Sequence, residues 1–174
     1  LSRLKPDNVG DIIAVVALYR PGPLGSGMVD DFIKRKHGLA KVTYQHPSLE
    51  KVLKTTYGVI VYQEQIMQIA HELAGLTMAE ALTMIKAISK KKASIIQARR
   101  EKFIAGAAAN GIEARTAEEI FGLIEFFAGY GFNKAHTTAY AYLTYRTAWL
   151  KTHYPVEFMA ATLTCEQGDT DKIV

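Results

Sequence analysis

The sequence predicts a mainly α-helical protein, and three observations lead to this expectation. Apolar residues recur at three- and four-residue spacing in several segments, for example 63–74, as in amphipathic helices. Residues that favour helix N-caps precede several of these segments. Prolines and glycines gather between them, where helices end. We therefore expect a compact multi-helix domain with extended loops and at most one short strand.

In the first part of the chain, caps and helix breakers define the expected elements. Asp7 or Asn8 can cap the first helix. The run Pro21-Gly22-Pro23 is expected to exclude helix, because proline lacks an amide donor and glycine adds flexibility. The helices expected here cover residues 11–18, 30–36, 48–54 and 63–74, with an irregular stretch at 39–47 and a short strand at 59–62.

The second part contains two sequence patterns of the capping-box type, Thr77 with Glu80 and Thr116 with Glu119. Asn110-Gly111 is a typical helix end. The helices expected here cover residues 77–88, 93–109, 116–127, 136–151 and 155–164, with a loop at 128–134.

Composition limits the class of protein. The 174 residues are 49% hydrophobic and 22% charged, which allows one domain with a real core and excludes a disordered chain. The single cysteine, Cys165, cannot form an internal disulfide or supply a zinc cluster. Residues 1–10 lack a signal-peptide pattern, and no apolar run approaches the roughly 18 residues of a membrane span. We expect a soluble, cytoplasmic protein, and the initial leucine suggests a piece of a longer chain.

The excess of basic residues is concentrated between positions 86 and 102. This stretch has a net charge of +6, whereas the whole chain has +4, so the rest carries −2. Such clustering indicates a polyanionic partner; the alternative is a solvated helix face, which usually has acidic residues at three- and four-residue spacing. The seven basic residues are Lys86, Lys90, Lys91, Lys92, Arg99, Arg100 and Lys102, with Glu101 as the one acid.

Two loops depart from local helix propensity. In the first, the prolines on either side of Gly22 stiffen the backbone and present Arg20; the alternative is a rigid turn with Arg20 in water. In the second, 128–136, glycines flank Tyr130, and Lys134 and His136 stand where a helix begins. A lysine beside a helix N-terminus suits a phosphate; the alternative is a glycine-rich corner with Phe132 in the core.

Patterns for catalysis or metal binding are mostly absent. The sequence contains no nucleophile elbow, no H-E-x-x-H and no P-loop. Asp169-Thr170-Asp171 could bind magnesium, but a turn or helix cap is the favoured interpretation. Glu64 is expected at the surface or at a helix cap rather than as a general base. We therefore predict no catalytic residue and no metal ligand in this chain.

Several long strings resemble the family C replicative DNA polymerases, the bacterial DNA polymerase III alpha subunits. They are L-Y-R-P-G-P-L at 18–24 with S-G-M-V-D at 26–30 and R-K-H-G at 35–38, T-Y-G-V-I-V-Y-Q-E-Q at 56–65, F-A-G-Y-G-F-N-K at 127–134, T-A-W-L-K at 147–151, and H-Y-P at 153–155 with E-F-M-A-A at 157–161. The resemblance covers essentially the whole chain. It implies that residues 1–174 are the fingers domain, with at most the edge of the palm at 1–10.

This resemblance implies a module of a DNA-directed DNA polymerase in bacterial replication that binds an incoming dNTP and template-primer DNA. The metal-binding aspartates of the family lie upstream, so Mg²⁺ would be bound by palm residues outside the chain, and the piece alone would be inactive. The implied partners are the palm domain of the same chain and, through regions not present, the sliding clamp and clamp loader. The alternative is a stand-alone basic helical module that binds nucleic acid without chemistry.

Motif position and chemistry assign the candidate residues. We expect the triphosphate-facing set to be Arg20, Lys86, Lys90, Lys91, Lys134 and His136, and the base-pair pocket to be lined by Tyr130 and Phe132. Contacts with the DNA backbone are expected from Arg99, Arg100 and Lys102, for which solvent is the alternative, and from a second group, Lys34, Arg35 and Lys36. The chain departs from the L-R-R-A-M-G-K-K string of the family, since Ile85 and Lys86 replace two arginines. Isoleucine cannot contact phosphate, and lysine lacks the bidentate fork of arginine. Ala135 likewise replaces a serine of the family.

Overall fold

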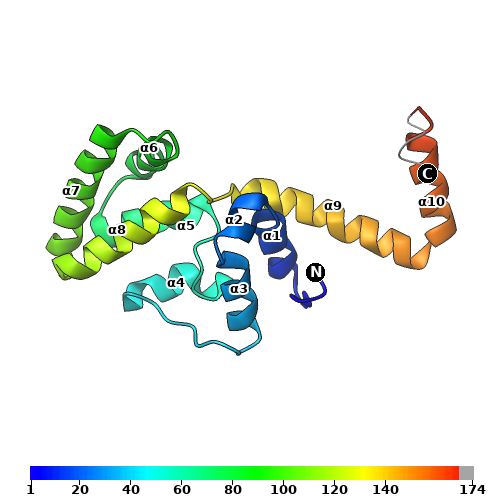
Figure 1. Ribbon diagram of the computed structural model, residues 1–174, viewed down its shortest axis with the longest axis horizontal. Coiled ribbons are helices and arrows are strands. Elements are labelled where there is room, and N and C mark those ends of the chain that lie inside the picture. Colours follow the sequence, from blue (N-terminus) through cyan, green and yellow to red (C-terminus); the bar gives the residue numbers. More distant parts are fainter. Residues whose placement is uncertain (169–174) are drawn as a thin grey trace.

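The computed structural model describes residues 1–168 and confirms a mainly α-helical protein. Helices α5 to α8 pack together at one end of an elongated molecule, and α1 to α3 occupy its middle (Figure 1). Helix α9 runs from the middle toward the opposite end, where α10 turns away from it (Figure 1). The elements are α1 (Val9–Leu18), α2 (Pro21–Gly25), α3 (Met28–Lys36), η1 (Pro47–Leu49), α4 (Glu50–Leu53), η2 (Lys54–Thr56), α5 (Gln63–Ala74), α6 (Met78–Ser89), α7 (Ala93–Ala109), α8 (Ala114–Ala128), α9 (Lys134–His153) and α10 (Pro155–Cys165).

The helical turn α2 contradicts the expectation that its two prolines exclude helix. Pro21 occupies the first helical position after the N-cap Arg20. The amides of a first turn have no partner within the helix, so prolines at positions 21 and 23 sacrifice no hydrogen bond there. The turn closes when Leu24 N donates to Arg20 O at 3.0 Å.

One predicted capping box is confirmed and the other is wrong. At the start of α6, Thr77 N donates to the Glu80 carboxylate at 3.0 Å, and Glu80 N donates to Thr77 Oγ1 at 3.3 Å. Helix α8, however, begins at Ala114, so Thr116 lies inside its first turn instead of capping it.

The strand expected at 59–62 is reduced to an isolated bridge between Tyr62 and Phe132. In this bridge Gln63 N donates to Phe132 O at 3.0 Å, and Phe132 N donates to Val61 O at 3.1 Å. The bridge joins the segment before α5 to the loop before α9. It therefore holds together two segments that are 70 residues apart in sequence.

A buried glutamine organises the segment that precedes α5. The Gln65 side-chain oxygen accepts hydrogen bonds from Val61 N at 2.9 Å and Tyr62 N at 3.0 Å. Its amide nitrogen donates to Thr56 Oγ1 at 2.7 Å. Because Gln65 is 4% exposed and its side-chain oxygen and nitrogen both have partners, the network replaces the hydrogen bonds that a strand partner would supply.

The hydrophobic core has two parts. The first fills the α5–α8 bundle and contains Ile66, Met84, Phe103 and Phe121. The second lies between α1, α3 and residues 59–62, with Phe32 at its centre. Loop residues 130 and 132 pack at the border of this second cluster, so the loop before α9 is built onto folded structure.

The described residues contain no helix that is both long enough and apolar enough to cross a membrane.

Candidate functional site

The two loops singled out in the sequence meet in the structure. Arg20 Nη2 donates to Tyr130 O at 2.5 Å, and Arg20 Nε donates to Ala17 O at 2.8 Å. The guanidinium carbon lies 4.5 Å from the centroid of the Phe132 ring, which is a cation–π distance. Burial lowers the pKa of Arg20, although an arginine stays charged in proteins. Arg20 is therefore held in a defined position and is not a free surface side chain.

Gly22 allows this close approach. A Cβ at position 22 would lie 2.8 Å from a ring carbon of Tyr130, closer than real Cβ contacts come. The Tyr130 ring is also in edge contact with Phe126 at a centroid distance of 5.6 Å. The glycine of the first loop thus makes room for the tyrosine of the second.

Lys134 and His136 continue the same corner onto α9. The His136 ring lies 5.3 Å from the Phe132 ring and 4.4 Å from the ring of Tyr140. Lys134 Nζ lies 5.4 Å from the centroid of the Tyr62 ring. We name Arg20, Tyr130, Phe132, Lys134 and His136 the arginine corner. Its two α9 residues are exposed, whereas Tyr130 and Phe132 are half-buried.

The start of α9 differs from the anion site expected there. Lys134 N donates to both oxygens of the Glu64 carboxylate, at 3.0 and 3.1 Å, and His136 N donates to Asn133 Oδ1 at 2.8 Å. These first-turn amides are therefore already occupied, and a phosphate would have to rely on the side chains. Glu64 has the capping role expected for it. Asparagine is a favoured N-cap, so the sequence did contain a signal for Asn133.

The lysines between α6 and α7 form a separate cluster. Lys86, Lys90 and Lys92, with Thr83 and Ile95, line an open cavity of about 130 Å³. Lys91, which was assigned from the sequence, adopts a left-handed backbone (φ 53°) and does not line this cavity, whereas Lys92 does. The cavity belongs to the α6–α7 end of the molecule, while the arginine corner lies at the start of α9 (Figure 1). We name these cavity-lining lysines the lysine turn.

Ile85, one of the departures from the family string, is buried. It is 2% exposed and belongs to the core of the α5–α8 bundle. Lys86, its neighbour, is exposed and lines the cavity. The isoleucine therefore serves packing, and the cationic role at this site falls on the lysines.

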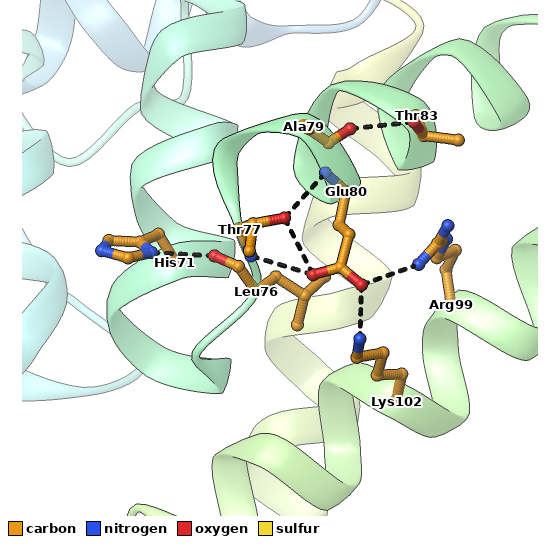
Figure 2. Close-up of polar contacts among 8 residues, drawn as sticks. All are labelled: His71, Leu76, Thr77, Ala79, Glu80, Thr83, Arg99 and Lys102. Carbon is orange, nitrogen blue, oxygen red and sulfur yellow. Dashed lines mark hydrogen bonds and ion pairs between the residues drawn. The ribbon is translucent and has the colours of Figure 1, made fainter.

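Two of the cations assigned to the DNA backbone are paired with one glutamate. Arg99 Nη1 lies 3.4 Å from Glu80 Oε1, and Lys102 Nζ also donates to this oxygen (Figure 2). Lys102, with the Thr77 contacts, lowers the pKa of Glu80 to about 2. Glu80 belongs to α6, whereas Arg99 and Lys102 belong to α7, so the spacing of residues along the chain did not show this acidic partner.

Arg100 also has an acidic partner from a neighbouring helix. Its guanidinium lies 3.7 Å from Glu125 of α8 and 5.5 Å from the Phe121 ring centroid. It is partly exposed, at 36% of its side chain. Arg99, Arg100 and Lys102 thus tie α7 to its neighbours as well as contributing positive charge.

Lys36 is placed differently from the DNA contact predicted for it. Its side chain is 5% exposed and lies 2.9 Å from Asp11 and 3.0 Å from Asp7. The Asp11 hydrogen bond raises the pKa of Lys36. This enclosure favours a structural role for Lys36 over the DNA contact predicted for it. Lys34 is exposed, and Arg35 donates to Tyr57 O at 3.4 Å.

Within residues 1–168 there is no group of three or more histidine, cysteine or acidic side chains placed to hold a metal ion. The D-x-D string at Asp169 and Asp171 lies outside the described residues.

Comparison with known proteins gives a consistent result. The model of the bacterial DNA polymerase III alpha subunit finger domain matches residues 1–111. Three relatives, each named DNA polymerase III subunit alpha, come from Pasteurella multocida (57% identity), Pseudomonas aeruginosa (55%) and Escherichia coli K12 (53%). Each alignment covers all of this chain, but the chain spans only 15% of each relative's length.

Proposed function

The chain belongs to the finger-domain family of the bacterial DNA polymerase III alpha subunit, and we propose that it binds the triphosphate of an incoming dNTP and the backbone of template-primer DNA. The observation that carries the proposal is the arginine corner, where two distant loops meet and bring Arg20, Lys134 and His136 together, with the Glu64 carboxylate at the start of α9 as their acidic neighbour.

The chemistry of this corner suits a triphosphate. Arg20 uses Nε and one Nη2 proton for backbone carbonyls, and its Nη1 group has no hydrogen-bond partner among the described residues. Free guanidinium N–H groups on a fixed arginine suit phosphate oxygens, because little side-chain freedom is lost on binding. Lys134 and His136, both exposed, add further donors beside it.

In the proposal, Tyr130 and Phe132 position the phosphate-binding side chains. The Tyr130 carbonyl holds Arg20, and the Phe132 ring lies beside both Arg20 and His136. In this arrangement the two aromatic residues form the wall of the nucleotide pocket and fix the donors that face the phosphates. Preorganised donors of this kind stabilise developing charge without reorganising during phosphoryl transfer.

The lysine turn supplies a second phosphate site in the proposal. Lys86, Lys90 and Lys92 line one open cavity, and Lys91 is adjacent to two of them in sequence. Because this cavity and the arginine corner lie on different elements, the two sites would hold different phosphates of the nucleotide–DNA complex. Lys34, Arg35, Arg99, Arg100 and Lys102 remain the candidates for contacts with the DNA backbone.

In the proposal, palm residues outside this chain bind Mg²⁺, which the chemistry of polymerisation requires, and the 174 residues alone would not polymerise DNA. The palm domain, the sliding clamp and the clamp loader are proposed partners of the full-length enzyme.

Charge reversal at the arginine corner tests the proposal. Lys134→Glu in the full-length polymerase should reduce kcat/KM for nucleotide incorporation by about a hundredfold or more, because a phosphate contact becomes a repulsion. Primer-template affinity should change less than threefold. The matched control is Lys41→Glu, an exposed lysine outside the corner. Loss of DNA affinity with unchanged incorporation by the bound enzyme would instead favour a nucleic-acid-binding module without a nucleotide site.

A further inference from the structure

The arm formed by the second half of α9 and by α10 has an uncovered apolar surface. Among the described residues, no residue from 142 to 165 is buried, although this stretch contains 24 residues in two helices. Helix α10 packs against α9, and Figure 1 shows it at the free end of the molecule. The exposed apolar and aromatic side chains are Tyr142 (61%), Leu143 (53%), Tyr145 (54%), Trp149 (43%), Leu150 (41%), Tyr154 (50%), Val156 (76%), Met159 (51%) and Leu163 (42%).

An arm of this kind is not self-sufficient. Helices gain most of their stability from packing an apolar face, and short isolated helices are marginal in water. Singly exposed apolar residues are ordinary, but an apolar surface spread along two consecutive helices marks an interaction site. Something must cover this arm in the functional protein.

The chemistry of the arm favours a protein surface over nucleic acid. Five of its exposed side chains are aliphatic or thioether groups, which neither stack on bases nor donate to phosphates. Three of the aromatic rings already have partners within the arm: Arg146 lies over Tyr142 at 5.4 Å, and Trp149 lies 4.6 Å from the His153 ring and 5.8 Å from the Tyr154 ring. The arm is also basic, with Arg146 and Lys151 against the single acid Glu157. A covering surface should therefore be apolar with carboxylates at its edge.

The comparisons indicate where that surface is. The relatives match the chain over its full length, including the arm, yet the chain spans only 15% of each relative. The finger-domain model matches only residues 1–111, so the arm lies outside the part that defines the domain. Most of a polymerase of the relatives' length is thus available to cover the arm within one polypeptide. A second copy of this chain would instead bring the same basic residues into one interface.

We propose that the α9–α10 arm is an intramolecular docking surface, covered in the full-length polymerase by an apolar, carboxylate-edged face from outside residues 1–174. The inference rests on the proposed function, because the covering face is assigned to the full-length polymerase. Docking of the arm would hold the start of α9, and with it Lys134 and His136, in a fixed position relative to the rest of the enzyme.

Hydrogen exchange of the full-length polymerase without substrates tests the docking. Amides of residues 142–165 should exchange within about tenfold of those in α5, which lies in the core, and much more slowly than those of the non-helical segment 39–45. Exchange as fast as in 39–45 would overturn the proposal. Protection that appears only with primer-template DNA, or only at high enzyme concentration, would also overturn it and would identify nucleic acid or a second copy as the occupant.

Substitution of the arm provides a second, local readout. Val156→Asp together with Met159→Asp should raise exchange across 142–165 at least tenfold while α5 stays protected, because two buried carboxylates would oppose docking. The control is Leu39→Asp, at a residue that is 77% exposed and outside the arm. Unchanged exchange in the double variant would contradict docking. This exchange measurement does not depend on nucleotide binding. The Lys134→Glu experiment can therefore fail while docking is supported, and docking can fail while the Lys134→Glu experiment succeeds.

Discussion

At the residue scale, Lys36 and Asp11 form an ion pair that is almost fully enclosed. Their side chains are 5% and 3% exposed, and Tyr57 Oη also donates to Asp11 at 3.3 Å. Asp11 belongs to α1 and Lys36 to α3, so the pair joins the two helices. A buried charge that loses its partner is costly, because the remaining charge has neither water nor a counter-ion.

Lys36→Met should therefore lower the free energy of unfolding of this region by about 3–5 kcal/mol. Hydrogen exchange of the core amides of α1 and α3 in the full-length polymerase measures the change. Lys34→Met, at an exposed lysine of the same helix, should have an effect close to zero. Weaker DNA binding by Lys36→Met without loss of stability would contradict this structural role and support the DNA contact predicted for Lys36.

At the element scale, the crossing of α5 and α7 depends on Gly106. A Cβ at position 106 would lie 2.0 Å from the carbonyl oxygen of Ala74, and Asn110 Nδ2 donates to Leu73 O at 2.9 Å beside it. The backbone of α5 cannot yield as a side chain can. The glycine therefore sets the close approach of the two helices.

Gly106→Ala should destabilise the α5–α8 bundle by about 1–3 kcal/mol, because the helices must move apart. Gly122→Ala in α8 is the matched control, since a Cβ there meets nothing within 4 Å. The control should stabilise by about 0.5–1 kcal/mol through the better helix propensity of alanine. Exchange rates of α5 and α7 amides report both changes, and equal effects of the two alanines would refute a close crossing.

The junction of α6 and α7 should respond to pH through Glu80. Its pKa is lowered from an ordinary value of 4.5 to about 2, chiefly by the hydrogen bond from Lys102. A lowered carboxyl pKa contributes stability above pH 4.5, and that contribution is lost as the pH falls toward 2. Glu80→Gln should flatten this part of the stability–pH profile, measured by hydrogen exchange of α6 amides. If the stability of Glu80→Gln fell between pH 4.5 and 2 as steeply as that of the unmodified protein, the pH dependence would belong to other carboxylates.

At the scale of the whole molecule, the position of α9 depends on small side chains. Helices α1 and α9 are in contact, and Ala14, Ala17 and Ala141 are each at most 1% exposed. Small residues let two helix axes come close, as they do in other tight helix pairs. The start of α9 carries Lys134 and His136 of the arginine corner, so this contact also fixes the corner.

Ala141→Leu should displace α9 from α1 at a cost of about 1–3 kcal/mol. The KM for dNTP should rise more than kcat falls, because Lys134 and His136 move away from Arg20. Ala139→Leu, at an exposed position of the same helix, should leave both constants unchanged. Steady-state incorporation by the full-length enzyme distinguishes the two variants, and identical kinetics would show that α9 does not position the corner.

Most helices could be predicted because their signals are local. The capping box at Thr77 and the end of α7 at Asn110 require only neighbouring residues. The strand predicted at 59–62 was wrong because a tertiary contact determines the structure there. The Gln65 side chain accepts hydrogen bonds from the amides of Val61 and Tyr62, and the segment forms only a single bridge. Sequence patterns do not show which partner a buried amide will take.

The amino-acid sequence by itself determined the helical class, the family and the basic character of residues 86–102, since these follow from composition, spacing and long matching strings. Only the tertiary structure decided which cationic side chains are already engaged by other groups of the protein and which are free to contact a phosphate. Arg20 reaches a carbonyl 110 residues away, Lys36 is enclosed by carboxylates, and Glu80 pairs with two residues of α7. The physical reason is that the partner of a charge is set by distance in space, and chain folding brings together groups whose separation along the sequence carries no information about it.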